Sequence, residues 1–190
     1  MTDDARTSVP LIEFDTERLR LRQWRESDLA PFFALACDPQ VMEFLLPLPT
    51  RADSDASADR ARALIAKDGW GFWAVEHKAS GEFIGFTGLN APLATLPLSP
   101  CVEIGWRFAR HAWGQGFATE AARGALQVGF DQLALDEIVA FTAVGNLRSA
   151  AVMERIGMTE DLAGAFAHPL VPEGHKLRRH RLFRIGRPQR

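Results

Sequence analysis

The sequence predicts a single α/β domain of the α+β kind, with helices packed on a mixed, mostly antiparallel sheet. Three observations predict this class. Two strand-like runs flank a short polar turn, which favours an antiparallel hairpin. A strand, a helix and a second strand then follow one another over residues 102–144, and a crossover of that length makes two strands parallel and right-handed. A chain of 190 residues that is 47% hydrophobic can bury one sizeable core.

The beginning of the chain predicts a strand and a short helix. Residues 1–15 start with a polar stretch, and we expect this segment to be flexible. Residues 18–22 alternate arginine with leucine, the period-two pattern of a strand with one solvated face. The helix is expected to begin after Ser27 or Asp28, which are suitable N-cap residues, and to end at Asp38, which precedes a proline.

A second helix and a hairpin follow. The polar run 50–69 predicts a loop that enters a helix ending at Gly69. Residues 70–90 hold two aromatic and β-branched runs around a turn at 78–81, which predicts the antiparallel hairpin. Residues 91–100 are interrupted by prolines and predict a loop.

The second half of the chain alternates strands with helices. Asn146 is expected to cap the last helix and Gly157 to end it. The expected strands cover residues 101–108, 137–144 and 180–185, and the expected helices cover 119–132 and 146–157.

The turn before the first of these helices consists largely of small residues. In HAWGQGFATEAARGAL, residues 111–126, larger side chains at Gly114, Gly116 and Ala118 would keep a phosphate from the backbone. Free N–H groups at a helix N-terminus bind anions, so this turn outlines a phosphate site. An ordinary tight turn explains the glycines equally well from spacing alone. The alternation of small residues therefore indicates a site without proving one.

Two other phosphate motifs fit this turn badly. A Walker-type loop is excluded because no Gly-Lys-Ser/Thr tripeptide is present. A dinucleotide fingerprint requires a small residue where this chain has Thr119, although Asp136 lies at a suitable distance downstream. The dinucleotide site therefore stays as a secondary alternative.

Composition argues against several classes of protein. The formal charge of −2 gives no general attraction to nucleic acid or to anionic membranes. No apolar run approaches the length of a membrane span, and the N-terminus lacks the pattern of a secretory signal, so we expect a cytoplasmic protein. Cys37 and Cys101 are expected to be free thiols, and no Cys/His cluster has metal-ligand spacing, so we expect no metal.

Several ordered segments together resemble the GNAT acetyltransferases, and most closely their RimJ/RimL-type branch. The resemblance covers nearly the whole chain and lies in TERLRLRQWRESDLAPFFAL, VEIGWRF, WGQGFATEA, NLRSAAVMERIGM and HPLVPEGHKLRRHRLFRI. It implies one GNAT domain over 1–190, with helices on both faces of the sheet and a splayed parallel strand pair. It also implies direct acetyl transfer from acetyl-CoA to an amine acceptor, either a small molecule or a protein N-terminus. The alternative is a non-catalytic acyl-CoA sensor or scaffold, and a homodimer stays open.

The resemblance also assigns the cofactor-binding residues. The family's Gln/Arg-x-x-Gly-x-Gly/Ala pattern maps onto Trp113, Gly116 and Ala118, and Trp113 departs from it, although the branch commonly has an aromatic residue there. Asn146 is implied to bind the pantetheine arm. The backbone expected to hold the pyrophosphate is that of Trp113, Gly114, Gln115, Gly116, Phe117, Ala118 and Thr119, and the strand expected along pantetheine includes Trp106, Arg107 and Phe108. Gly105 marks a possible bulge beside that strand.

Acetyl transfer to an amine needs a base, because an alkylamine has a pKa of about 10.4. Glu103 interrupts an apolar strand beside the expected thioester site and is our candidate, with acceptor binding or plain solvent exposure as alternatives. Ser149 is the candidate proton donor to the leaving sulfur, because the chain contains no tyrosine and many relatives use one. Glu120, on a first helical turn, is expected to be structural.

The remaining polar residues predict little chemistry. His111 lies near the expected phosphates, but a surface role explains it as well. Residues 175–190 are strongly basic, which could indicate RNA binding. An alternating final strand explains them better as a solvated face, so we expect no nucleic-acid partner.

Overall fold

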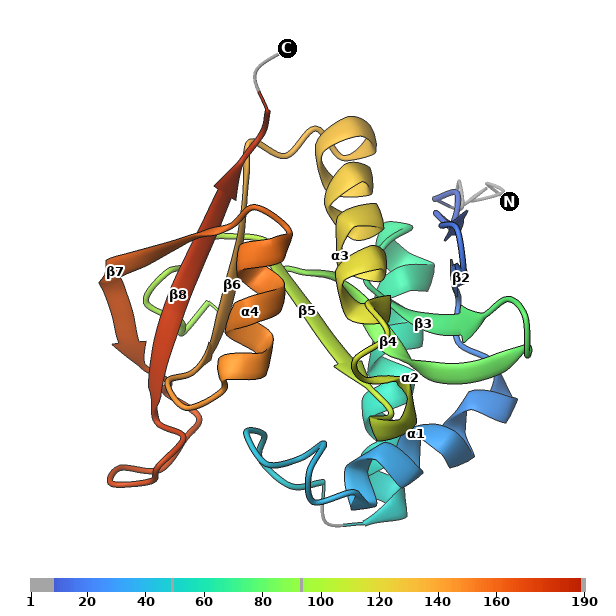
Figure 1. The fold of residues 1–190 in the computed structure, drawn as a ribbon, viewed down its shortest axis with the longest axis horizontal. Coiled ribbons are helices and arrows are strands. Elements are labelled where there is room, and N and C mark those ends of the chain that lie inside the picture. Colours follow the sequence, from blue (N-terminus) through green and yellow to red (C-terminus); the bar gives the residue numbers. More distant parts are fainter. Residues whose placement is uncertain (1–8, 49, 93, 189–190) are drawn as a thin grey trace, which may run out of the picture.

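The computed structural model describes residues 9–48, 50–92 and 94–188, which form a sheet of eight strands with helices on both faces (Figure 1). The strand order is β1-β2-β3-β4-β5-β6-β8-β7. The strands are β1 (Phe14–Asp15), β2 (Leu19–Arg22), β3 (Phe72–His77), β4 (Glu82–Asn90), β5 (Glu103–Phe108), β6 (Glu137–Ala143), β7 (Thr159–Ala167) and β8 (Arg179–Gly186). The α-helices are α1 (Leu29–Cys37), α2 (Arg51–Asp68), α3 (Phe117–Gln127) and α4 (Leu147–Arg155).

The parallel pair β5–β6 is joined at one end only. Every other neighbouring pair is antiparallel, and the only register partners between β5 and β6 are Glu103 and Val139. The Val139 N–H donates to the Val102 carbonyl at 2.9 Å, and beyond this point the two strands diverge (Figure 1). The predicted mixed sheet and its splayed pair are therefore confirmed.

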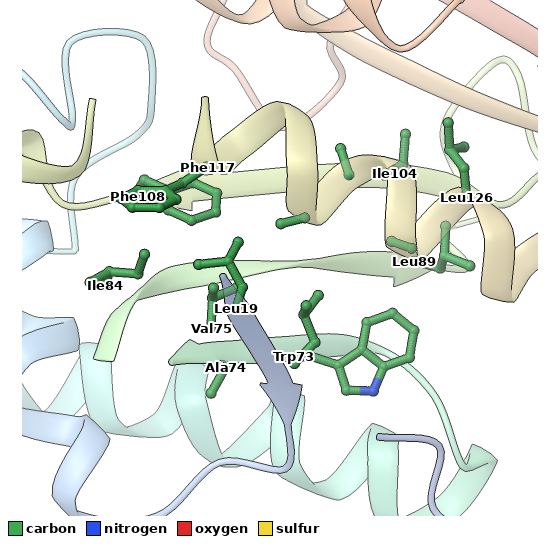
Figure 2. Close-up of a cluster of buried hydrophobic side chains, with 14 of the residues drawn as sticks. Leu19, Trp73, Ala74, Val75, Ile84, Leu89, Ile104, Phe108, Phe117 and Leu126 are labelled. Atoms are coloured by element: carbon green, nitrogen blue, oxygen red, sulfur yellow. The ribbon is translucent and has the colours of Figure 1, made fainter. Parts of the chain in front are cut away.

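Two apolar layers hold the helices on the sheet. On one face, Ile104 and Phe108 of β5 lie against Phe117 and Leu126 of α3 (Figure 2). On the other, Phe32 of α1 joins an aromatic group whose rings lie 5.1–6.0 Å from one another. This group consists of Trp24, Phe32, Phe72, Phe83 and Phe86. Both faces of β4 and β5 are thus covered, and these strands lie between two packed apolar layers.

Two helix starts differ from the prediction. The polar run after Thr50 is helical from Arg51, because the Thr50 hydroxyl accepts from the Asp53 N–H and the Asp53 carboxylate accepts from the Thr50 N–H. The expected loop there was wrong. The α3 helix begins at Phe117 rather than Thr119, and its last turn is a π-helix over Val128–Gln132.

Two short or irregular strands were not predicted. β1 is only two residues long, and β7 is an edge strand rich in alanine and glycine, without an apolar alternation. Charges hold β7 to β8: Arg181 pairs with Glu160 at 2.6 Å, and Arg184 pairs with Asp161 at 2.8 Å. These pairs also neutralise part of the basic C-terminal stretch.

The solvated face predicted for residues 18–22 is wrong at one position. Arg22 is 3% exposed, and its guanidinium binds the carboxylates of Asp28 and Glu76. Asp28 stands at the predicted N-cap of α1, but its carboxylate binds Arg22 and the Arg25 N–H instead of capping that helix. The start of helix α1 and strand β3 bring these carboxylates to Arg22. The alternation therefore predicted which residues share a face of β2, but not that other elements cover this face at Arg22.

The described part of the N-terminal segment is attached to the sheet. The Ile12 N–H donates to the Gly69 carbonyl, and the Ile12 carbonyl accepts from the Trp73 indole. Residues 1–8 of that segment lie outside the described residues. Within the described chain, no helix is long and apolar enough to cross a membrane.

Candidate functional site

One large cavity passes through the opening between β5 and β6. It measures 1120 Å³. On the α3 side it is lined by the turn before α3 and the first turns of α4, and on the other side by aromatic residues of the α1 layer. A molecule as long as an acyl-CoA arm can therefore reach from one face of the sheet toward the other.

The diverging strand leaves backbone groups unpaired toward this cavity. The carbonyls of Gly105 and Arg107 point toward β4. Thr87 Oγ1 donates to the Gly105 carbonyl at 2.9 Å, and the Arg107 carbonyl oxygen lies where a Cβ on Gly85 would stand. Because successive residues of a strand alternate, Ile104 and Trp106 direct their backbone groups toward β6. The Ile104 N–H takes part in the Glu103–Val139 pairing, so the Ile104 carbonyl and both groups of Trp106 face the departed strand. These are the backbone groups that a peptide-like arm can bind.

The glycine turn adopts the left-handed conformation twice. Gly114 and Gly116 have φ values of +74° and +81°. A Cβ on Gly114 would meet nothing within 4 Å, so conformation, not crowding by the protein, requires glycine there. Gly116 is the N-cap of α3 and provides no capping side chain. The first N–H groups of α3, from Phe117 to Thr119, therefore stay available for an anion.

Other residues of this turn have structural side chains. The Trp113 indole donates to the Phe108 carbonyl at 2.9 Å and closes the strand-to-helix connection. Phe108 and Phe117 are buried in the core, so only their backbone can face a ligand. Gln115 does not line the cavity, because its amide donates to the His111 carbonyl at 2.8 Å.

Asn146 and Ser149 meet at the N-terminus of α4, as predicted. Asn146 Oδ1 accepts from the Ser149 N–H at 3.2 Å, which confirms the cap. Its Nδ2 donates to Thr142 Oγ1 and to Ser149 Oγ at 2.9 and 3.0 Å. Because the Ser149 oxygen accepts this bond, its hydroxyl proton is free to be donated into the cavity. Thr142 was missed by the sequence analysis, because its partner lies four residues away in a different element.

Glu103 lies at the closed end of the parallel pair, beside the cavity rather than on its wall. Asn90, which does line the cavity, donates to Glu103 Oε1 at 2.8 Å. Burial raises the pKa of the Glu103 carboxyl, and the hydrogen bond from Asn90 offsets part of that rise. Asn90 was not predicted, although an amide that ends an apolar strand was a visible signal.

Glu120 is a structural residue. Its carboxylate accepts from the Thr16 hydroxyl at 2.6 Å and from the Arg18 N–H and Nε at 2.8 and 2.7 Å. Burial alone would raise the pKa of Glu120, but these hydrogen bonds outweigh it and hold the pKa below its ordinary value. The carboxylate thus ties the β1–β2 turn to α3.

Comparison with known proteins places this fold in a family. Residues 18–159 match the model of the acetyltransferase (GNAT) domain, so the chain belongs to the GNAT family and is an N-acetyltransferase. The uncharacterized protein YkkB of Bacillus subtilis is 34% identical over 144 residues, which cover 75% of this chain and 83% of that protein.

Solved structures agree with this assignment. An acetyltransferase from Agrobacterium tumefaciens is 28% identical, with a TM-score of 0.72 over 97% of this chain and 99% of its own. A spermidine N-acetyltransferase from Vibrio cholerae, solved with CoA and spermine, shares the fold with a TM-score of 0.69 at 21% identity, over 90% of this chain and 96% of its own. Among the described residues, no group of three or more His, Cys, Asp or Glu side chains is arranged to hold a metal ion.

Proposed function

We propose that the chain transfers an acetyl group from acetyl-CoA directly to a primary amine, as a member of the RimJ/RimL-type branch. The continuous cavity through the strand opening is the observation that carries this proposal. Uncapped N–H groups of α3 lie at one end, where the pyrophosphate is expected, and unpaired groups of β5 lie along the middle. The V. cholerae relative of the same fold binds CoA and a polyamine, which supports an amine acceptor.

The proposed chemistry has three proton and electron movements. The neutral amine attacks the thioester carbonyl, whose developing oxyanion is stabilised by a backbone N–H of the splayed strand, such as that of Trp106. Glu103 takes the amine proton through a water molecule, since it does not line the cavity itself, and Asn90 orients its carboxylate. The carbon–sulfur bond then breaks, and Ser149 donates a proton to the departing sulfur while it takes one from water.

Acetyl transfer itself is tested with labelled acetyl-CoA. The full chain is incubated with a panel of peptides and small amines, and mass spectrometry detects the acetylated product while a thiol reagent follows free CoA. Transfer of the label to at least one primary amine supports the proposal. Binding of acetyl-CoA without transfer to any acceptor would favour the sensor instead.

Gly116→Val should weaken acetyl-CoA binding about tenfold. A branched residue at φ +81° costs about 1–2 kcal/mol, and the turn can escape this strain only by moving the N–H groups of α3. Calorimetric titration measures the affinity. Gly81→Val is the matched control, because Gly81 has φ +71° and open space around it, and it does not line the cavity. Unchanged affinity in a folded Gly116→Val variant would remove this turn from the site.

Ser149→Ala should lower kcat by less than about tenfold, with little dependence on pH. A thiol with a pKa of about 8.5 leaves fairly well unassisted, so a proton donor contributes modestly. Steady-state kinetics on an established acceptor measures this. Because Ser149 also accepts from Asn146, the variant's melting temperature is measured in parallel, and a large kcat loss at unchanged stability would give Ser149 a greater role.

A further inference from the structure

The α1 side of the cavity contains a guanidinium without a partner. The side chain of Arg107 extends from β5 toward α1, with its guanidinium carbon 5.4 Å from the centre of the Phe86 ring and 5.9 Å from that of Phe32. Its Nε and Nη1 are buried, and neither has a hydrogen-bond partner in the described chain. Arg107 lines the cavity, and its third nitrogen, Nη2, is not among these buried atoms, so a ligand in the cavity approaches the guanidinium from the Nη2 side.

Arg22 is a structural arginine whose charge is paired, and it can be compared with Arg107. Arg22 is buried, but Asp28 and Glu76 surround it, and although burial alone would lower its pKa, these carboxylates raise it. Among the described residues no such carboxylate faces Arg107, and burial lowers the pKa of its guanidinium to about 10. Within the described residues, carboxylates therefore neutralise the buried Arg22, whereas none neutralises the partly buried Arg107.

The aromatic neighbours do not compensate this burial. Cation–π contacts attract a guanidinium but give its N–H groups no hydrogen-bond acceptor, and a charge withdrawn from water without such acceptors is unfavourable. An anionic group of a ligand would supply the hydrogen-bond acceptors that the Arg107 guanidinium lacks in the free protein. Guanidinium groups prefer planar carboxylates, to which they can donate two parallel bonds.

The position of Arg107 relates this anion to the reacting amine. Glu103, Gly105 and Arg107 alternate onto the same face of β5, and the rise of a strand places the first and last about 13 Å apart. Gly105 lies between them, and the Phe72 ring covers it, 3.2 Å from where a Cβ would stand. An acceptor lying along this ring would direct its amine toward the Glu103 end and its anionic group toward Arg107.

We propose that the amine acceptor carries a carboxylate on an apolar body, and that Arg107 binds this carboxylate. This rests on the proposed acetyl transfer and names its substrate class. The body is apolar because aromatic side chains form the walls around Arg107: Trp24, Phe32, Phe72 and Phe86. Arg107 was first expected to serve the cofactor through its backbone, but its carbonyl points toward β4 and its side chain to the acceptor side.

Ligand binding tests this without requiring turnover. Calorimetry compares phenylacetate with the uncharged 2-phenylethanol, in the presence of saturating CoA, on the wild-type chain and on Arg107→Met. The wild type should bind phenylacetate at least about tenfold more tightly, the effect expected of a charge-assisted hydrogen bond. Arg107→Met should lose this preference and keep its affinity for CoA. Arg123→Met, which removes an exposed arginine of α3, should keep the preference.

Several results would overturn the proposal. These are equal binding of both probes by the wild type, an unchanged preference in Arg107→Met, and a loss of CoA affinity in that variant. An Arg107-dependent preference for phenyl phosphate over phenylacetate would contradict the carboxylate. Arg107→Met should melt no lower than the wild type, because it removes a charged group with two buried nitrogens that have no hydrogen-bond partner. If it does not fold, Arg107→Lys replaces it, and should bind phenylacetate more weakly than the wild type. Failure of acetyl transfer alone would leave these binding results unaffected.

Discussion

Replacing Arg22 with methionine should lower the free energy of unfolding by about 3–5 kcal/mol, the usual effect of breaking a buried ion pair. Its Nη1 and Nη2 lie 2.7 and 3.0 Å from the Asp28 carboxylate oxygens, and its Nε lies 2.8 Å from Glu76. Without Arg22, the 1% exposed Asp28 keeps only the bond from the Arg25 N–H. Thermal unfolding should show a melting temperature lower by about 10 °C.

Arg20→Met is the control on the same strand. Arg20 pairs with Asp15 at 3.0 Å, but both side chains are nearly half exposed, at 48% and 46%. Exposed pairs contribute about 0–1 kcal/mol, so this variant should unfold almost like the wild type. Equal losses in both variants would mean that the buried cluster does not stabilise the fold as the geometry indicates.

The sheet could be predicted where the chain alternates large apolar and polar residues. The hairpin of β3 and β4 and the crossover from β5 to β6 came from such patterns and from the length of the connection. β7 could not be found this way, because its stability comes from pairing with β8 and from charges such as Glu160 with Arg181. An edge strand of small residues has no local pattern of its own.

The site could be predicted where the backbone conformation constrains the residue type. Gly114 and Gly116 are required by positive φ, and Asn146 caps α4 as its position indicated. The buried Arg22 and the partly buried Arg107 could not be recognised, because a period of two shows which residues share a face and not whether a helix covers that face. Arg22 and Arg107 both lie under the α1 layer, which distant parts of the chain build.

The ability of Glu103 to act as a base depends on pH, because burial raises the pKa of its carboxyl group. A carboxyl group whose pKa is raised by burial is protonated over a wider range, and it acts as a base only above that raised pKa. The wild-type kcat/KM should therefore rise with pH through a pKa above the ordinary value of Glu. Asn90 favours the charged form through its hydrogen bond, so Asn90→Ala should move this rise to higher pH.

Glu103→Gln should lower kcat by about 10²-fold at neutral pH, within the usual range for general base catalysis. Glutamine keeps the size of the side chain and can still accept from Asn90, so the loss reports the missing base rather than a cavity. The loss should shrink at high pH, where an alkylamine with a pKa of about 10.4 is increasingly neutral without help. Asn90→Ala separates the two effects, because it moves the acidic limb of the profile, whereas Glu103→Gln abolishes it. If Glu103→Gln kept both kcat/KM and its pH profile on a genuine acceptor, the amine proton would have to leave to solvent or to another residue.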